Sequence, residues 1–535
     1  MSDAPQTLTG FDTPDSDGTS VLPGTPQTAS PAALSNPKAD LAAMEELERH
    51  LYAHRYAQRG MSSYATTIDP QTATDDRAEA LAILQEEDQA LLCSPETGAL
   101  LERLTAAQAL LNPIQAAQVR ILRRDRERLV NVPAEVQSDF TRLTSQATDA
   151  WARAKRNNDW GVFEPFLDRI VTQLREIAAF RNPSCDPYDV WLDEFEHDTN
   201  HDFYDRFFAQ VKDVVVPLLA DVKHSRRRQE RSPFDGRFDV GRQWDLARDL
   251  MRLEGIDESK VFLTSTEHPF SNSLTSNYAI IAGHMHENDL LSGVYTILHE
   301  GGHALYDMGV DRRFDRTSLQ GGTSMGMHES QSRFFENYIG RSQAFAPRLV
   351  EVMARHFRGQ LGRATQGQFY AAVNRVKAQP IRTEADELTY PLHVLVRYEI
   401  EKLLLSGEAT AADVPRLWAE LYRSYLGITV PNDTLGALQD VHWADGAFGY
   451  FPTYALGSAF GAQFRASMLR EGMDFDGICR AGDLTPIHSW LRNRIWSHGR
   501  SLDSTELILD ACGEPFSPSY YTSYLTEKFS ALYGL

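Results

Sequence analysis

Two histidines four residues apart, His299 and His303, enclose Glu300 in a largely apolar stretch of the chain. Side chains with this spacing share one face of an α-helix, so on a helix both imidazoles can point at one metal ion. Zinc bound in this way keeps one position open for water and lowers the pKa of that water to about 7. A carboxylate beside the ion, here Glu300, can then accept the proton of the attacking water. The spacing therefore predicts a helix that carries a catalytic metal site.

Gly301 and Gly302 stand between the two histidines. Each glycine weakens a helix by about 1 kcal/mol relative to alanine, so the pair counts against this helix. Glycines inside an apolar helix are expected where another backbone, or a substrate, approaches closely. The prediction of a metal site therefore needs a third ligand to support it.

Glu329, which follows His328, supplies such a ligand. Two histidines from one helix and a glutamate from the next form the His₂Glu set of a catalytic zinc site. Arg333 can orient Glu329, and Asp307 can fix the tautomer of His303. Each of these two charges is equally compatible with a solvated helix face. The apolar residues behind Glu329 recur at helical spacing and place it on the first turn of a second helix: Phe334, Phe335 and Ile339.

Five short motifs occur in a defined order along the chain: His268-Pro269-Phe270, His299 to His303, His328-Glu329-Ser330, Ile381 to Asp386 (I-R-x-x-A-D) and Gly436 to Trp443 (G-x-x-Q-D-x-H-W). These motifs and their order resemble the M32 metallocarboxypeptidases, the thermostable carboxypeptidase Taq type. The resemblance extends over roughly residues 41 to 535.

The resemblance implies a mainly α-helical fold, with one large domain over residues 39–535, a deep active-site cleft and a small β-sheet beside the zinc helix, as in neurolysin-like peptidases. It implies a zinc-dependent enzyme that removes C-terminal residues from peptide substrates. The metal ligands would be His299, His303 and Glu329, with Glu300 as general base. Members of the family are typically homodimers and often accept Co²⁺ in place of Zn²⁺.

Family motifs also surround five further candidate site residues. A neutral imidazole or phenol near the metal can donate to the oxyanion of a tetrahedral intermediate, and His442 and Tyr454 are the predicted donors. The predicted substrate-binding residues are Arg382, for a terminal carboxylate, together with His268 and Tyr450. His268 can also be a plain turn histidine; its place in the HPF motif favours contact with substrate.

One element of the family pattern is missing. Between HPF and the zinc helix the family usually carries D-x-R-x-T, whose arginine is thought to bind the free carboxylate of the substrate. The corresponding residues are Tyr278 to Ala282, with Ile280 in place of the arginine. Isoleucine cannot replace a bidentate arginine–carboxylate pair. Either Arg382 binds the C-terminus alone, or His284 or His286 substitutes, or the substrates differ from those of the family.

The predicted site residues extend from residue 268 to residue 454, so the 535-residue chain is expected to form one large cooperative body. Its net charge of −21 makes nucleic acid and anionic membrane surfaces poor partners. The 4 cysteines are far apart and indicate neither disulfides nor a thiolate metal site. The start lacks a secretory signal, and no apolar run approaches the roughly 18 residues of a spanning helix, so a cytoplasmic location is expected.

Residues 1–38 are rich in Pro, Ser, Thr, Asp and Gly and are expected to form a disordered tail. Two strands are expected, over residues 261–266 and 277–282, in a small sheet along whose edge a peptide can lie. Helices are expected over residues 78–92, 100–130, 133–157, 163–180, 201–224, 240–253, 484–498 and 520–533.

Three alternative functions stay open. The absence of the arginine at Ile280 suggests a metal-dependent oligopeptidase that does not require a free C-terminus. A metal-binding or peptide-binding module without turnover is a second alternative, against which the intact Glu300 argues. The third is a serine hydrolase, because Ser324 lies in a G-x-S-x-G sequence. That motif requires a buried strand before the serine, and the preceding residues are too polar to form one.

Overall fold

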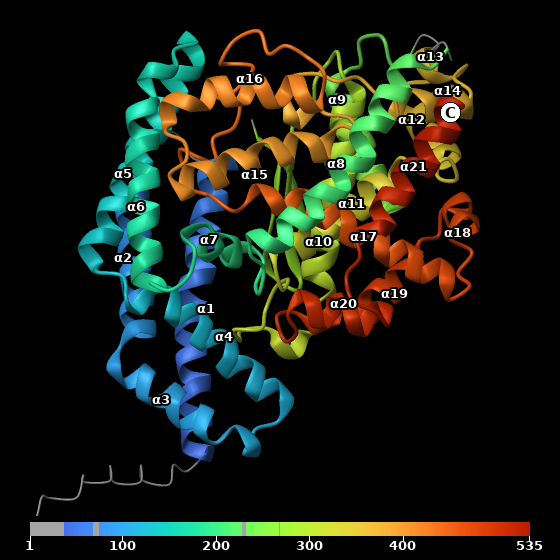
Figure 1. Cartoon of the computed structure of the whole chain (residues 1–535). Helices are drawn as coiled ribbons and strands as arrows, with labels where there is room; N and C mark the ends of the chain where they lie inside the picture. Colours follow the sequence, from blue (N-terminus) through green and yellow to red (C-terminus); the bar gives the residue numbers. More distant parts are fainter. Residues whose placement is uncertain (1–36, 68–73, 227–231, 267) are drawn as a thin grey trace, which may run out of the picture.

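The computed structural model describes residues 37–67, 74–226, 232–266 and 268–535. Helices make up most of this part of the chain, and one small sheet lies among them (Figure 1). The predicted tail lies outside the described residues, apart from Pro37 and Lys38, which begin the first helix. None of the described helices is both long and apolar enough to cross a membrane.

The first half of the chain contains α1 (Pro37–Thr67), α2 (Thr74–Cys93), α3 (Pro95–Ala106), η2 (Gln108–Leu110), α4 (Pro113–Val130), α5 (Ala134–Asn157), η3 (Trp160–Val162), α6 (Glu164–Arg181), α7 (Pro187–Phe195), α8 (His201–His224), α9 (Val240–Leu253), η4 (Glu258–Lys260), β1 (Val261–Ser265), β2 (Phe270–Thr275) and β3 (Tyr278–Gly283). The second half contains α10 (Leu290–Gly309), η5 (Arg312–Phe314), α11 (Met325–Arg333), the π-helix η6 (Phe334–Gly340), α12 (Ala346–His356), α13 (Arg358–Leu361), α14 (Gln366–Val373), η7 (Arg382–Glu384), α15 (Tyr390–Ser406), η8 (Ala411–Asp413), α16 (Val414–Tyr425), α17 (Phe451–Arg470), α18 (Phe475–Ala481), α19 (Thr485–Arg494), η9 (Trp496–His498), α20 (Ser504–Cys512) and α21 (Ser519–Tyr533).

Most predicted helices are present, and α8 and α9 have the predicted bounds. The helix predicted over residues 100–130 is instead divided into α3, η2 and α4. A local cap explains the break, because Asn112 and Gln115 form a capping box and Pro113 begins the next helix. The helices that are not predicted from the sequence are α7, α12, α13, α14, α16, α18 and α20.

The sheet has the strand order β1-β3-β2, with β3 parallel to β1 and antiparallel to β2. The two predicted strands correspond to β1 and β3. The sequence of β2, FSNSLT, is too polar to predict as a strand, and β2 lies at one edge of the sheet. Helix α10 packs against β2 and β3, and α1 packs against β2.

The helices α10, α11 and α17 pack together in the middle of the molecule, with α1 to α6 gathered on one side (Figure 1). Glycines permit these crossings. A Cβ atom on Gly302 of α10 would lie 2.6 Å from the carbonyl oxygen of Gln331 in α11. A Cβ atom on Gly457 of α17 would lie 2.6 Å from Cβ of Glu329. The expectation that a backbone approaches the glycines of the metal helix is thus confirmed for Gly302.

The N-terminus of α11 is held by a buried carboxyl group. Ser324 is the N-cap residue, since its Oγ accepts a hydrogen bond from the backbone N–H of Met327 (3.0 Å). The same hydroxyl donates to Glu196 (2.8 Å), which also accepts from the N–H of Gly326 (3.1 Å). These contacts assign Ser324 to helix capping, so the structure offers no support for a serine nucleophile.

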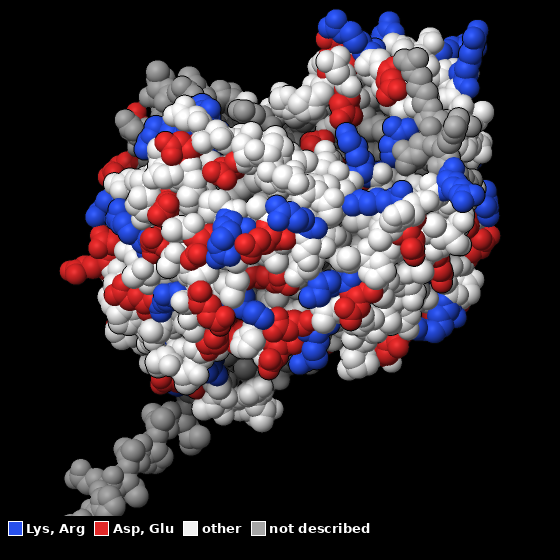
Figure 2. Space-filling model, turned by 45° about the horizontal axis from the view of Figure 1, so that its top comes forward, with Lys and Arg blue, Asp and Glu red and all other residues white. Residues whose placement is uncertain are grey.

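Acidic and basic side chains are interspersed on the face of the molecule seen in Figure 2. The expectation, drawn from the net charge of −21, that nucleic acid is a poor partner stays a prediction.

We predict that Glu196 makes stability depend on pH. Burial raises its pKa from 4.5 to about 7, so the folded protein holds this proton more tightly than the unfolded chain does. The resulting stabilisation is complete below pH 4.5 and is lost as the pH rises through 7. Between pH 5 and pH 8, the free energy of unfolding should fall by about 2–3 kcal/mol more in the wild type than in Glu196→Gln.

Urea denaturation at the two pH values measures this difference. Glu135→Gln, which alters an exposed glutamate, is the control and should follow the wild type. An identical pH response of Glu196→Gln and the wild type would contradict the prediction.

Candidate metal centre

His299 and His303 of α10 and Glu329 of α11 converge on one point. The Nε2 atoms of the two histidines lie 3.7 and 3.6 Å from Oε2 of Glu329. The three residues offer ligand atoms that all lie within 4.8 Å of one another. Zinc–ligand bonds of about 2.1 Å in tetrahedral geometry place two ligand atoms about 3.4 Å apart. Two imidazoles and a carboxylate at these separations therefore suit a zinc ion.

The other ring nitrogen of His299 is also occupied. Its Nδ1 lies 3.0 Å from Oε2 of Glu336, which belongs to the π-helix η6 that continues α11. A carboxylate on Nδ1 directs the imidazole so that Nε2 faces the metal, and such partners typically strengthen metal binding. The sequence analysis does not identify Glu336, although it stands seven residues after Glu329 in the same run.

A second histidine intervenes between His303 and Asp307. Nδ1 of His303 lies 3.3 Å from Nδ1 of His328, and Nε2 of His328 lies 3.1 Å from Asp307. The prediction that Asp307 directly fixes the tautomer of His303 is therefore wrong. The carboxylate acts on His303 through His328, which reaches between them from α11.

Arg333 contacts both carboxylates that surround His299. Its Nε donates to Glu329 (2.6 Å) and its Nη1 donates to Glu336 (3.0 Å), so the predicted contact with Glu329 is confirmed. Burial alone would raise the pKa of Glu329, but the charge of Arg333 and the two histidines lowers it to about 2. Glu329 is thus ionised, as a metal ligand must be.

A cleft of about 600 Å³ contains the three converging side chains. Glu300 lines it beside His299 and His303, as do Tyr450, the N-cap residue of α17, and Tyr454, in the first turn of that helix. The edge strand β2 forms part of one wall, and the expectation that a peptide lies along it stays a prediction. Its contribution consists of Phe270, Ser271, Asn272, Ser273 and Thr275.

Tyr454 lines the cleft, whereas His442 lies behind it. Nε2 of His442 lies 3.1 Å from the hydroxyl of Tyr454. Burial, together with the nearby charge of Arg382, lowers the pKa of His442 to about 3, so its imidazole is neutral. Burial raises the pKa of Tyr450 to about 12 and that of Tyr454 above its usual value, so both phenols keep their protons.

Arg382 does not line the cleft. It is buried, and its Nε and Nη2 donate to Oδ1 of Asp440 at 3.1 and 2.9 Å. Arg397 contacts the other oxygen of Asp440 (2.6 Å), which fixes the loop that carries His442. The ring of Tyr454 lies 4.9 Å from the Arg382 guanidinium. This geometry favours a role in holding the loop and Tyr454 over the predicted contact with a substrate carboxylate.

Three other predicted or suggested residues also lie away from the cleft. His268 is exposed, and only its neighbours Pro269 and Phe270 line the cleft. Nδ1 of His284 lies 2.8 Å from the carbonyl oxygen of Thr266, and its ring lies 4.4 Å from that of His286. None of the three histidines therefore reaches the space beside the metal ligands.

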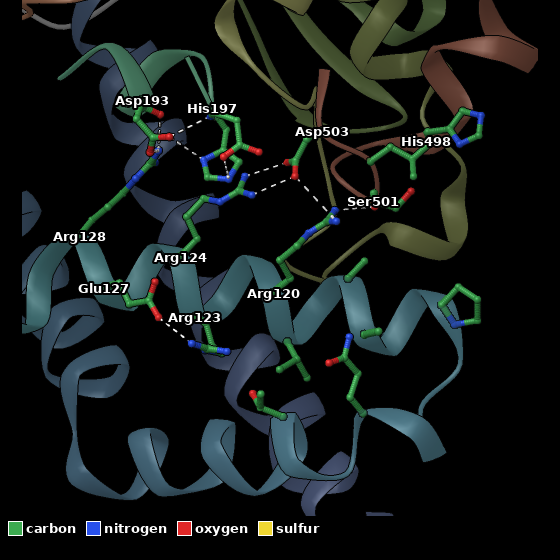
Figure 3. Close-up of a pocket in the computed structure, with 18 of the residues that line it drawn as sticks. Arg120, Arg123, Arg124, Glu127, Arg128, Asp193, His197, His498, Ser501 and Asp503 are labelled. Carbon is green, nitrogen blue, oxygen red and sulfur yellow. Dashed lines mark hydrogen bonds and ion pairs between the residues drawn. The ribbon is translucent and has the colours of Figure 1, made fainter. Parts of the chain in front are cut away.

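A larger hollow of about 1500 Å³ adjoins the cleft. Arg124, Arg128, Glu194 and His197 line both spaces. Figure 3 shows α4 along this wall, with Arg124 pointing to Asp503. The two spaces thus meet at a wall of alternating basic and acidic side chains.

Comparison with known proteins agrees with the site. The family model of the carboxypeptidase Taq (M32) metallopeptidases matches residues 43–529. Carboxypeptidase 1 of Bacillus subtilis is 34% identical over 466 residues, which cover 87% of this chain and 93% of the relative. Thermostable carboxypeptidase 1 of Thermus thermophilus is 34% identical over 483 residues, which cover 88% and 94%. The crystal structure of an M32 carboxypeptidase from Deinococcus radiodurans R1 matches with a TM-score of 0.89 and 33% identity, covering 93% of this chain and all of that chain (100%).

We predict that Glu336→Gln weakens zinc binding about 10-fold to 100-fold, because the substitution removes the negative charge beside Nδ1 of His299. Competition with a chromophoric zinc chelator measures the affinity without any assay of activity. Glu351→Gln, which alters an exposed glutamate paired with Arg348 and Arg355, is the matched control. An unchanged zinc affinity in a folded Glu336→Gln protein would show that this carboxylate does not support the site.

Proposed function

The chain belongs to the carboxypeptidase Taq (M32) metallopeptidase family, and we propose that it removes C-terminal residues from peptides in a zinc-dependent reaction. Carboxypeptidases are peptide hydrolases, so the protein is an enzyme. The observation that carries the proposal is the convergence of His299, His303 and Glu329 in a cleft that Glu300 also lines.

The three ligands would hold the ion, which when bound supplies a Lewis acid and lowers the pKa of a nearby water. Glu300 is one residue from His299 on α10 and is 8% exposed, so its carboxylate faces the cleft with little competing solvent. We assign to it the removal of a proton from the attacking water and the delivery of that proton to the leaving amine.

Tyr454 is the donor best placed to stabilise the negative charge that develops on the carbonyl oxygen of the scissile bond. Its phenol lines the cleft and keeps its proton, because burial raises its pKa. His442 would act through Tyr454. Its Nε2 lies 3.1 Å from the hydroxyl of Tyr454 and would hold that hydroxyl in place. Tyr450 is a further cleft phenol that we propose for substrate contact.

The alternatives to a carboxypeptidase are less well supported. The capping role of Ser324 removes the basis for a serine hydrolase. An oligopeptidase or a binding module without turnover is not favoured by the relatives, which are named carboxypeptidases. Zinc rather than another divalent ion is proposed from the donor set of two imidazoles and a carboxylate. The use of Co²⁺, the homodimer and the cytoplasmic location stay predictions.

Glu300→Gln should abolish hydrolysis while the protein still binds one zinc ion. Glutamine has nearly the shape of glutamate but cannot accept the proton, so the rate should fall by at least about 100-fold. Turnover of a peptide and the zinc content of the same sample measure the two effects separately. Full activity with Gln at position 300 would exclude the assigned general base.

A peptide with a free C-terminal carboxylate should be cut far faster than the same peptide with a C-terminal amide. Mass spectrometry of the products should show a ladder of single-residue losses from the C-terminus. Equal rates for the two peptides, or internal cuts, would indicate an oligopeptidase instead. Removal of the metal with a chelator should stop cleavage of both.

A further inference from the structure

Four arginines line the cleft that contains the metal ligands, and three of them form ion pairs with acidic side chains. Arg124 makes two hydrogen bonds to Asp503, at 2.9 and 3.1 Å. Arg128 forms an ion pair with Glu194 (3.4 Å), and Arg500 forms one with Asp125 (3.4 Å). These three charges are already neutralised by the protein. The fourth is Arg59 of α1.

Arg59 forms no ion pair with any of the described residues. Its Nη1 donates to the carbonyl oxygen of Ser273 in β2, at 3.5 Å. A guanidinium carries five N–H donors, and the remaining donors of Arg59 have no acceptor in the described part of the chain. Arg59 is exposed and lines the cleft, so its side chain borders the space that a substrate would occupy.

The position of Arg59 relative to the sheet is defined by Asn272. The amide of Asn272 donates to Oγ of Ser63 (2.7 Å) and to the carbonyl oxygen of Arg59 (3.5 Å), so α1 lies over this strand. Asn272 pairs with Ile280 in β3, and paired residues project from the same face of a sheet. Arg59 therefore lies over the face to which Ile280 belongs.

The three strands themselves carry no basic residue. An element that packs on the sheet can supply positive charge on this side of the cleft, and α1 is such an element. The charge of Arg59 also acts on Asp307, which contacts His328 beside the metal ligand His303. Although burial raises the pKa of Asp307, the charges of His328 and Arg59 contribute to lowering it below its usual value.

We propose that Arg59 binds the terminal carboxylate of the peptide substrate. The inference rests on the proposed carboxypeptidase function, because only a substrate cut at its C-terminus brings a free carboxylate into this cleft. A guanidinium binds a carboxylate through two parallel hydrogen bonds, and the unused donors of Arg59 have this geometry. The bound carboxylate would lie beside the edge of β2, where Ser273 holds the guanidinium in place.

The test compares two blocked tetrapeptides that differ only in a C-terminal carboxylate or amide. For the acid, Arg59→Gln should raise KM about tenfold and leave kcat within about twofold, because the lost contact binds substrate rather than the transition state alone. For the amide, KM should not change. Arg59→Lys should recover part of the affinity, since lysine keeps the charge but not the paired donors.

Arg55→Gln is the matched control. Arg55 is one turn earlier on α1 and contacts Asp125 (3.3 Å), and it is not among the residues that line the cleft. This variant should keep the KM of the wild type for the acid. Thermal unfolding of each variant verifies that α1 remains folded against β2.

Calorimetric binding of the two tetrapeptides to Glu300→Gln, with and without Arg59→Gln, separates this inference from the proposed function. Tighter binding of the acid than of the amide, lost on substitution of Arg59, supports the inference without requiring turnover. Equal binding of the acid with and without Arg59 would overturn it, even if the wild type proves to be a carboxypeptidase. Absence of hydrolysis by the wild type would instead count against the proposed function.

Discussion

The close contact between α10 and α11 determines whether this protein has a metal site. His299 and His303 belong to one helix and Glu329 to the other, so their convergence depends on how closely the two backbones approach. Gly302 permits that approach, and Gly457 permits an equally close approach of α17 to Glu329. Since cores resist added volume, a methyl group at either glycine would separate the helices or displace the ligand.

The centre is also a concentration of buried charge. Glu329, Glu336, Arg333 and Arg341 contact one another at 2.6–3.2 Å and are shielded from solvent. Such groups are costly to bury one at a time, but each carboxylate here has a cation and each cation a carboxylate. Paired charges keep Glu329 ionised and hold His299 in one orientation, so the arrangement prepares the ligands before any ion binds.

The sequence predicts the centre better than it predicts the surrounding residues. The spacing of His299 and His303 has a direct physical meaning, because side chains four residues apart lie on the same face of a helix. Glu336 follows Glu329 by seven residues, a spacing that places both side chains on one helix face, but the spacing alone does not show that His299 packs against that face. Motif resemblance also cannot tell which way a side chain points. Arg382 and His268 were predicted to bind substrate, but Arg382 contacts Asp440 and His268 is exposed to solvent. Many of the helices were predictable from their apolar spacing, whereas α7 and the polar edge strand β2 were not.

The depth of the cleft limits what can be a substrate. The side chains of His299, His303 and Glu329 are 20%, 17% and 6% exposed, and helices surround them. The last peptide bond of a compact folded protein cannot be threaded to that depth without local unfolding. Short peptides and unfolded chain ends can enter the cleft. Its depth therefore selects peptides over intact folded proteins, whatever residue the substrate chain ends in.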